Sequence, residues 1–234
     1  MGRTKLATWN VNGLRAREAQ LLEWLERERP DVVCTQEIKV ATESVPLTLR
    51  ELPGYVGRWH GTGAYSGVGL HLRKERFGSD ASIAPTSIDR ECRTLAAEVG
   101  DVVLASVYVP NGGKDFPAKM SFLADLERWI ASERARGRAV VVAGDINIAR
   151  TDDDVHPKER KAGAIGQRPD EREQLERILA GGMSDVVRAL RPDDHELFTW
   201  WAPWRNLRQR NIGWRIDYVL ASEPWASRAK ECAS

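Results

Sequence analysis

Apolar runs typical of buried strands alternate along this chain with runs of helical periodicity. Strand-like segments span residues 5–10, 31–37, 102–109, 139–143, 198–201 and 215–220. Two amphipathic helices are predicted between the early strands, the first ended by Pro30. Their apolar faces comprise Leu14, Leu21, Leu22 and Leu25 in the first and Phe122, Leu123, Leu126, Trp129 and Ile130 in the second. This alternation of strands and helices predicts a mixed, layered α/β fold.

Turn and loop signals separate these elements without dividing the chain. Residues 110–113 read Pro-Asn-Gly-Gly and predict a turn. Residues 151–170 are polar, contain two Gly and two Pro, and predict a long surface loop of the kind that often carries function. Short helices are expected near residues 171–180 and 184–190. Because no repeat, linker or low-complexity block interrupts the sequence, we expect a single domain spanning residues 1–234.

The composition is that of an ordinary soluble globular protein. Hydrophobic residues make up 42% and charged residues 29% of the 234 positions. No apolar run approaches the roughly 20 residues that span a bilayer, and a strand begins too early for a secretory signal to precede it. The irregular spacing of Cys34, Cys92 and Cys232 predicts neither disulfides nor a zinc site. We therefore expect a monomer in the reducing cytoplasm, with no membrane partner.

Charge is informative by its distribution, since the formal net charge is only +1. Between Trp204 and Arg215 the chain has four Arg and no acidic residue, with a Trp near either end. Basic residues interleaved with aromatics can follow a nucleic-acid backbone and stack on its sugars or bases. A solvated loop whose Arg stems cover a hydrophobic edge explains the composition equally well.

Polar side chains cluster where the predicted strands end. Glu37 closes one strand, and Asp145 and Asn147 follow another at a spacing that aims both at one face. Asn10 and Asn12 repeat that spacing. Carboxylates and amides gathered at the rim of a sheet can hold a divalent cation and a phosphate. Taken singly, each has a plainer explanation, such as a solvated strand terminus or an Asx turn.

Five motifs occur in order along the chain. They are Thr8-Trp9-Asn10-Val11-Asn12-Gly13-Leu14-Arg15, Thr35-Gln36-Glu37-Ile38-Lys39, Val107-Tyr108-Val109-Pro110-Asn111, Gly144-Asp145-Ile146-Asn147 and Gly213-Trp214-Arg215-Ile216-Asp217. With all five present, the chain resembles the exonuclease III family, the Mg-dependent apurinic/apyrimidinic endonucleases of the endonuclease/exonuclease/phosphatase superfamily. The resemblance extends from residue 5 to about residue 222. It implies a four-layer α/β sandwich of the DNase I type, with two packed mixed β-sheets flanked by helices.

The resemblance also implies roles for the matching residues. It implies a site for Mg²⁺, with Mn²⁺ as a substitute, formed by Asn10, Glu37, Asp145 and Asn147. The implied catalytic residues are Tyr108, near the scissile phosphate; Asp145, which orients or deprotonates the attacking water; Asn147, which hydrogen-bonds the phosphate; and Asp217, which supports the family's catalytic histidine. Without the resemblance, a core Tyr with a satisfied hydroxyl is the preferred interpretation of Tyr108, and Asp217 could simply pair with Arg215.

DNA contacts are implied by the same resemblance. The matching positions are Asn12, Arg93, Asn111, Trp200, Trp214 and Ile216. The last three match a pocket for an extruded abasic sugar, whose flipping costs little because no base pair is broken. The plainer alternative is that Trp200 and Trp201 are core residues, and for Trp201 that alternative is preferred.

The C-terminal end departs from the family pattern. Family members continue into a Ser-Asp-His-x-Pro motif, whereas no His follows His195 in this chain. We therefore expect a C-terminally truncated domain that lacks its last strand or strands. The implied function is Mg-dependent hydrolysis of duplex DNA in base-excision repair, as a 3′–5′ exonuclease and abasic-site endonuclease acting on abasic sites and 3′ ends. The alternatives are an inactive, truncated DNA-binding relative and a phosphodiesterase or phosphatase of the same superfamily.

Overall fold

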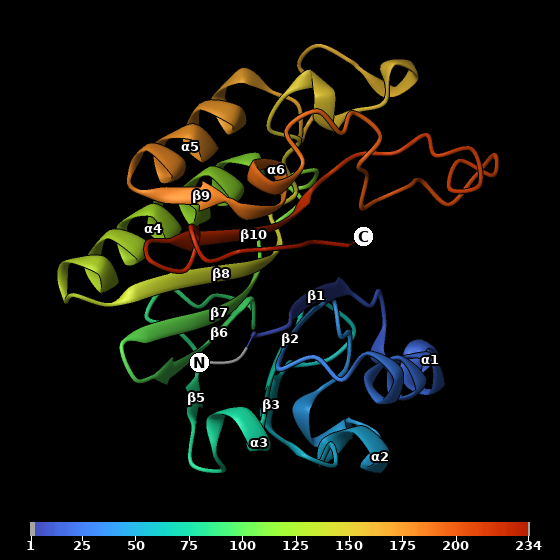
Figure 1. Ribbon diagram of the computed structural model, residues 1–234. Helices are drawn as coiled ribbons and strands as arrows, with labels where there is room; N and C mark the ends of the chain where they lie inside the picture. The colour runs from blue at the N-terminus through green and yellow to red at the C-terminus, as the bar shows by residue number, and fades with distance from the viewer. Residues whose placement is uncertain (1–2, 234) are drawn as a thin grey trace. The chain divides into compact units, whose positions relative to one another are not determined.

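The computed structural model describes residues 3–233, which form two compact units (Figure 1). Among the described residues, unit 1 runs as far as Tyr108 and includes Val140–Asp145. Unit 2 comprises Val109–Ala139 and the chain from Ile146 onward. None of the helices in the described part of the chain is both long and apolar enough to cross a membrane.

The first sheet of unit 1 has the strand order β1-β2-β4-β3. Its strands are β1 (Leu6–Asn10), β2 (Val32–Gln36), β3 (Tyr55–His60) and β4 (Val68–Arg73). β1 and β2 pair in parallel, whereas β4 runs antiparallel to both β2 and β3. Helix α1 (Leu14–Glu28) makes the crossover that the parallel pair requires. The 3₁₀ turn Thr42–Ser44 and helices α2 (Leu47–Arg50) and α3 (Lys74–Phe77) complete this half of the unit.

A second row of strands packs against this sheet within unit 1. In order, it comprises β5 (Ser82–Ala84), β6 (Thr94–Val99), β7 (Val102–Tyr108) and β8 (Ala139–Asp145). β2 and β4 contact β6 and β7 face to face. Every residue of β2 and β8 is consequently buried, which accounts for their continuous apolar sequences.

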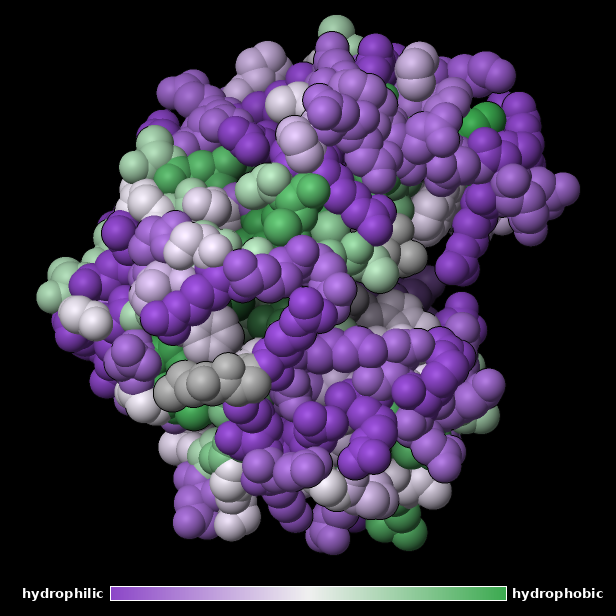
Figure 2. Space-filling model, in the orientation of Figure 1, coloured by the Kyte–Doolittle hydropathy of each residue, from purple (hydrophilic) through white to green (hydrophobic). Residues whose placement is uncertain are grey.

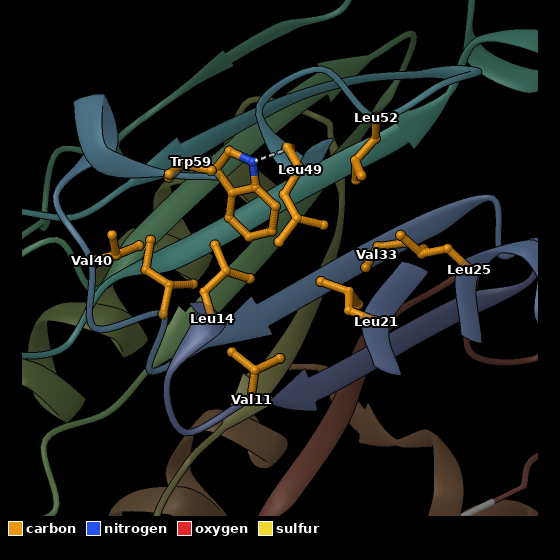
Figure 3. Close-up of a cluster of buried hydrophobic side chains, with 11 residues drawn as sticks. Val11, Leu14, Leu21, Leu25, Val33, Val40, Leu49, Leu52 and Trp59 are labelled. Carbon is orange, nitrogen blue, oxygen red and sulfur yellow. Dashed lines mark hydrogen bonds between the residues drawn. The ribbon is translucent and has the colours of Figure 1, made fainter. Parts of the chain in front are cut away.

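The core beneath α1 and α2 fixes the first sheet (Figure 3). Leu21 and Leu25 of α1 lie beside Val33 of β2, and Leu14 lies below Trp59 of β3. Trp59 is 4% exposed and donates its indole N–H to Leu49 O at 2.8 Å, so its one polar atom is satisfied inside the core. The leucines share one face of the helix because of their spacing, and this face packs α1 against the sheet.

Unit 2 is built on helices and a short antiparallel pair of strands. Its elements are α4 (Phe116–Ala135), the 3₁₀ turns Asp152–Asp154 and Pro157–Glu159, α5 (Pro169–Ala180), β9 (Met183–Asp185), α6 (Val186–Leu190) and β10 (Asp217–Ser222). α4 packs on α5, α5 on β9 and α6 on β10. Asp115 caps α4 by accepting from Ala118 N at 2.9 Å, one of the donors that a helix start leaves open.

Several predicted elements differ from the structure. The strand expected at residues 198–201 is wrong: only Trp200 pairs there, in an isolated antiparallel bridge with Trp214. The last strand begins at Asp217 instead of residue 215. The helix expected at 184–190 is divided between β9 and α6, because the Asp185 side chain caps a helix that begins only at Val186. The long loop 151–170 contains two 3₁₀ turns.

His71 is a titratable residue enclosed in unit 1. It is 2% exposed on β4, lies 4.3 Å from the Trp59 ring, and its Nδ1 has no hydrogen-bond partner. Burial lowers the pKa of His71 to about 3. Below about pH 6.5 the unfolded chain binds a proton at this residue that the folded chain does not, so stability rises with pH between about pH 3 and pH 6.5.

We predict that His71→Leu removes this acid sensitivity. Near pH 7.5 the variant should differ from the parent protein by less than about 1.5 kcal/mol, because the volume change is small. Between pH 6.5 and 4.5 the parent should lose roughly 1 kcal/mol per pH unit more than the variant. Urea unfolding at several pH values measures both slopes. His195→Leu, at an exposed position, is the control, and identical slopes for the His71 variant and the parent would refute the prediction.

Candidate active site

Four candidate residues of unit 1 lie at or next to strand ends. Asn10, Tyr108 and Asp145 are the last residues of β1, β7 and β8, and Glu37 directly follows β2. Glu37 has a φ of 52°, which turns the chain away from the strand. Packing of these strands therefore sets where the polar side chains lie.

Hydrogen bonds join these four side chains into one group. The Asn10 amide donates to Glu37 Oε1 at 2.8 Å and to Asp145 Oδ2 at 2.9 Å. The Tyr108 hydroxyl donates to the same Glu37 Oε1 at 3.0 Å. Two carboxylates are therefore held next to one amide nitrogen, where like charge accumulates unless a cation is near.

A nearby cation comes from the chain itself. Lys39 Nζ lies 2.6 Å from both Glu37 Oε2 and Asn12 Oδ1. Burial opposes ionisation of Glu37, but the hydrogen bonds from Asn10, Lys39 and Tyr108 and the Lys39 charge outweigh it, so the pKa of Glu37 is lowered. Burial, together with the charges of Glu37 and Asp145, raises the pKa of Tyr108 well above its usual value. Tyr108 is therefore a neutral hydrogen-bond donor at physiological pH.

Arg93 lies against this group. It is 5% exposed, its guanidinium lies 4.8 Å from the centroid of the Tyr108 ring, and it pairs with Glu91 at 2.9 Å. Arg93 and Asn12 thus adjoin the group through Tyr108 and Lys39. The family resemblance implied no role for Lys39. Its position two residues after Glu37, in the motif that spans residues 35–39, could have indicated one.

In unit 2, Asn111 and Asn147 form a second contact. Asn147 is 8% exposed and has a φ of 56°. Its amide donates to Val109 O at 2.9 Å, and its Oδ1 accepts from Asn111 Nδ2 at 3.2 Å. These two bonds fix which way the Asn147 carboxamide points, while Asn111 is exposed.

The remaining candidates of unit 2 gather around Thr199. Trp200 and Trp214 bond to each other through their backbones, and their rings meet edge to face at 5.7 Å. Thr199 Oγ1 accepts from the backbone N–H groups of both Ile216 and Asp217 at 3.1 Å. Trp200 is 38% exposed but Ile216 only 6%, so the aromatic ring and not the aliphatic chain faces solvent.

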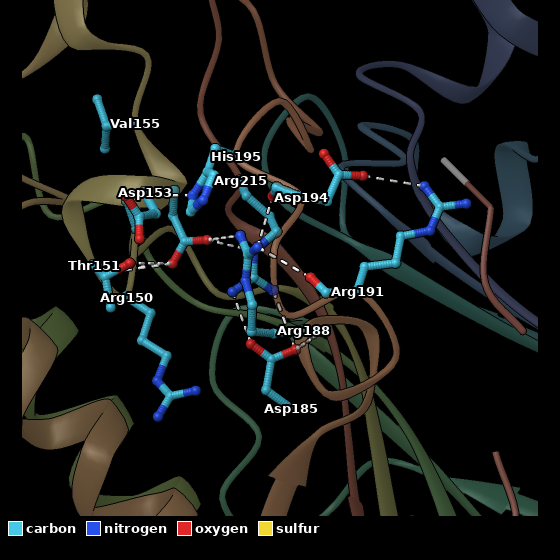
Figure 4. Close-up of polar contacts among 12 residues, drawn as sticks. Arg150, Thr151, Asp153, Val155, Asp185, Arg188, Arg191, Asp194, His195 and Arg215 are labelled. Atoms are coloured by element: carbon cyan, nitrogen blue, oxygen red, sulfur yellow. Dashed lines mark hydrogen bonds and ion pairs between the residues drawn. The ribbon is translucent and has the colours of Figure 1, made fainter. Parts of the chain in front are cut away.

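A buried ionic cluster holds the segment that leads into β10 (Figure 4). Arg215 is 1% exposed and donates to Asp154 Oδ1 and to Asp185 Oδ2, both at 2.7 Å. Arg188 also reaches Asp154, at 2.8 Å. Burial opposes ionisation of Asp154, but the two arginines outweigh it, and the pKa of Asp154 is lowered. Arg215 therefore forms its ion pairs with Asp154 and Asp185.

The basic stretch of unit 2 is an exposed loop. Arg205, Arg208 and Arg210 are exposed, as is Trp204 at 59%. Arg208 lies 5.3 Å from the centroid of the Trp201 ring, which is part-buried. The surface over this part of the chain, at the right of Figure 2, is mainly hydrophilic. The structure is compatible with both interpretations of the stretch, since the Arg208 guanidinium lies over an aromatic ring and the arginines are exposed.

Metal ligation has a limited set of donors. Within residues 3–233, no three or more His, Cys, Asp or Glu side chains cluster as a metal site. Glu37 and Asp145 bring two carboxylates to the Asn10 amide nitrogen, while Asn10 Oδ1 accepts from Asn12 N at 3.0 Å. Such donors suit a hard divalent cation that keeps several waters, and do not suit zinc, which prefers N and S ligands.

Residues 7–232 match the Endonuclease/Exonuclease/phosphatase family. The DNA repair nuclease APEX1 of Danio rerio is 33% identical over 227 residues, covering 93% of this chain and 73% of that protein. Exodeoxyribonuclease III of Haemophilus influenzae is 31% identical over 239 residues, covering 96% and 90%.

Solved structures agree with these matches. An AP endonuclease from Archaeoglobus fulgidus superposes with a TM-score of 0.87 at 27% identity, covering 98% of this chain and 91% of that one. A 3′ phosphatase, NExo, from Neisseria bound to a product DNA hairpin gives 0.87 at 28% identity, covering 98% and 90%. The predicted fold class, two β-sheets with flanking helices as in DNase I-like proteins, is confirmed.

We predict that Asp154→Asn destabilises the protein by about 3 kcal/mol, because it leaves the buried Arg215 charge only partly compensated. The carboxylate with the lowered pKa stabilises the fold above its unfolded pKa near 4, and this contribution is lost as pH falls through the folded value. The variant should therefore show a shallower loss of stability below pH 4. Asp153→Asn, at an exposed neighbour, is the control. Thermal unfolding measures both, and equal losses for the two would contradict the role given to the cluster.

Proposed function

We propose that this chain, which belongs to the Endonuclease/Exonuclease/phosphatase family, is a DNA nuclease of the exodeoxyribonuclease III and AP endonuclease type. It hydrolyses the phosphodiester 5′ of abasic sites and removes nucleotides from 3′ ends in base-excision repair. The observation that most supports this proposal is that the Asn10 amide holds the Glu37 and Asp145 carboxylates together. Two carboxylates held together at strand ends suit phosphate chemistry that is assisted by a cation.

Mg²⁺ is the cofactor that these residues fit, with Mn²⁺ as a substitute. Lys39 already places a positive charge 2.6 Å from Glu37, which supports a need for a cation beside these carboxylates. Asn10, Glu37 and Asp145, together with Asn147, would hold the ion. When bound, it would neutralise charge on the phosphate oxygens.

The chain's own residues divide the reaction between them. Asp145 is the proton acceptor that orients the attacking water, since it is ionisable and held in place by Asn10. Tyr108, kept neutral by its raised pKa, donates a hydrogen bond to the charge that develops on the phosphate. Asn147 donates to the same phosphate, and only one residue separates it from Asp145 in the chain. Asp217, the first residue of β10, matches the acid that supports the catalytic histidine in the family.

Duplex DNA is the proposed partner. Trp200, at the surface and braced by Trp214, offers a stacking face for a sugar. The proposed phosphate contacts are Asn12, Arg93 and Asn111. The exposed arginines of the 204–210 loop add positive charge that would attract the DNA backbone. Ile216, which is 6% exposed, is proposed to line the same sugar pocket. We propose that the protein acts as a monomer in the cytoplasm, where the buried free Cys34 and Cys92 stay reduced.

A 3′ phosphatase activity on DNA is the second candidate, favoured by the likeness to the Neisseria 3′ phosphatase. It uses the same attack on a terminal phosphate in place of an internal one. A duplex ending in a 3′-phosphate, offered alongside an abasic duplex and a small phosphate monoester, separates these activities. Cleavage of the monoester alone would instead indicate a small-molecule phosphatase.

We predict that the protein incises a duplex carrying one abasic-site analogue in the presence of Mg²⁺, and that chelator stops the reaction. Asp145→Asn should lower kcat by at least about 100-fold, because the variant cannot accept a proton from water. Gel analysis of the labelled strand measures both effects.

Asp101→Asn is the matched control, an exposed Asp of the same unit, and it should keep full activity. Incision by Asp145→Asn at the parental rate would overturn the proposed mechanism. Failure of the folded parent protein to cut any of the DNA substrates would overturn the function.

We also predict that Arg205→Ser with Arg210→Ser weakens binding to duplex DNA and lowers the slope of log K against log[salt] by roughly 2. Binding is measured with chelator so that no cleavage interferes. Arg128→Ser with Arg136→Ser removes two exposed charges from α4 and should leave the slope unchanged. Equal slopes for both double variants would show that the loop is only a solvated surface.

A further inference from the structure

Lys119 and Glu171 form an ion pair that is wholly enclosed in unit 2. Both side chains are 0% exposed, and Lys119 Nζ contacts Glu171 Oε1. Removing two charges from water is costly, and an apolar pair of similar volume is often at least as stable in such a place. The two residues therefore call for an explanation other than core packing, and the activity proposed above gives them no role.

The acceptors of Lys119 supply that explanation. Its three ammonium protons are matched by three acceptors: Glu171, the carbonyl oxygen of Asn147 at 2.8 Å and that of Asn111 at 3.2 Å. Asn111 and Asn147 are the two proposed phosphate contacts of unit 2. One buried cation thus holds the backbones of two loops that are 36 residues apart in the chain and whose side chains also bond to each other.

Glu171 holds the other side of the same arrangement. Its Oε2 accepts from Gly166 N at 2.7 Å and from Arg168 N at 3.2 Å. The Gly166 carbonyl in turn accepts from Ala149 N at 2.7 Å, and a Cβ at Gly166 would lie 3.2 Å from Asn147 O. The segment after Asn147 is therefore braced against a turn that the Glu171 carboxylate fixes.

The backbone at both loops is shaped around the lysine. Asn147 is a non-glycine residue with a φ of 56°, a conformation that persists when its surroundings determine it. Gly112, next to Asn111, has a φ of 87°, and a Cβ there would lie 2.8 Å from Lys119 Cδ. Only a glycine lets the turn pass so close to the lysine stem.

We propose that Lys119 and Glu171 are positioning residues, which set the Asn111 and Asn147 side chains for the phosphate through the carbonyl groups of both residues. The proposal rests on the function proposed above, which makes these asparagines phosphate contacts. Displacement of such a contact by about 1 Å can cost 100-fold in rate, so loss of the pair should lower kcat more than it changes substrate affinity.

Two variants and a control test the proposal. Lys119→Met removes the cation from both carbonyl groups. Lys119→Met with Glu171→Gln removes both charges but keeps an acceptor for Gly166 and Arg168, so it leaves no buried charge unpaired and supplies a folded protein if the single variant unfolds. Ile130→Ala, buried on the same helix, is the control, because it weakens the core without contacting either loop.

Two readouts are taken on each protein. The first is kcat and KM for the abasic duplex, where the double variant should lose about 10- to 100-fold in kcat with KM within about threefold. The second is the side-chain amide signals of Asn111 and Asn147 in ¹⁵N–¹H spectra without DNA. These signals should shift or broaden in the double variant and stay in place in Ile130→Ala.

Each result decides the proposal. A kcat within twofold of the parent in a folded double variant would overturn it, as would a lower kcat with both amide signals unmoved. If the parent protein cuts none of the DNA substrates, the proposed function fails. The amide signals then decide alone: movement supports the positioning of the two asparagines, and its absence refutes it.

Discussion

One side-chain amide holds two carboxylates together at the ends of different strands. Asn10 Nδ2 reaches both Glu37 and Asp145, and Glu37 also accepts from Tyr108. Packing of β2, β7 and β8, whose residues are almost all buried, brings the two carboxylates within a few ångströms of each other. Lys39 offsets part of that repulsion in the folded chain. The two carboxylates carry excess negative charge, which a divalent cation of the kind used in phosphate chemistry would neutralise.

Unit 2 also contains closely spaced charges, in this case as buried ion pairs. Lys119 with Glu171, and Arg215 with Asp154 and Asp185, place full charges where water does not reach. The pairs join residues that are distant in sequence: Lys119 of α4 with Glu171 of α5, and Arg215 with Asp154 and Asp185. Directional bonds to a charged centre fix an irregular loop more sharply than apolar contacts do, because apolar contacts tolerate sliding. The charged centres of unit 2 therefore order the loops that carry its candidate residues.

Family membership and geometry bear on different parts of the function. The match over residues 7–232 establishes the family, and the solved structures at a TM-score of 0.87 establish the fold class. The hydrogen bonds of unit 1 then join Asn10 and Tyr108 into one connected polar group, which family membership alone does not reveal. Both lines agree with a DNA repair nuclease of the exodeoxyribonuclease III and AP endonuclease type.

The sequence by itself determined the long elements and the polar residues that end them. Strands β2, β7 and β8 follow from short, mainly apolar runs that are buried on both faces, and helices α1 and α4 follow from apolar residues at helical spacing. The segment 198–201 has the same apolar and aromatic composition but forms only a bridge at Trp200, since a strand needs a partner along its length and composition does not show one. The motifs likewise marked Asn10, Glu37 and Asp145. Only the tertiary structure decided that one amide joins these three, that Lys39 offsets their charge, and that Arg215 pairs with Asp154 and Asp185. Apart from the Lys39–Glu37 pair, these contacts link residues 27 to 135 positions apart, and a one-dimensional pattern carries no information on which distant donor meets which acceptor.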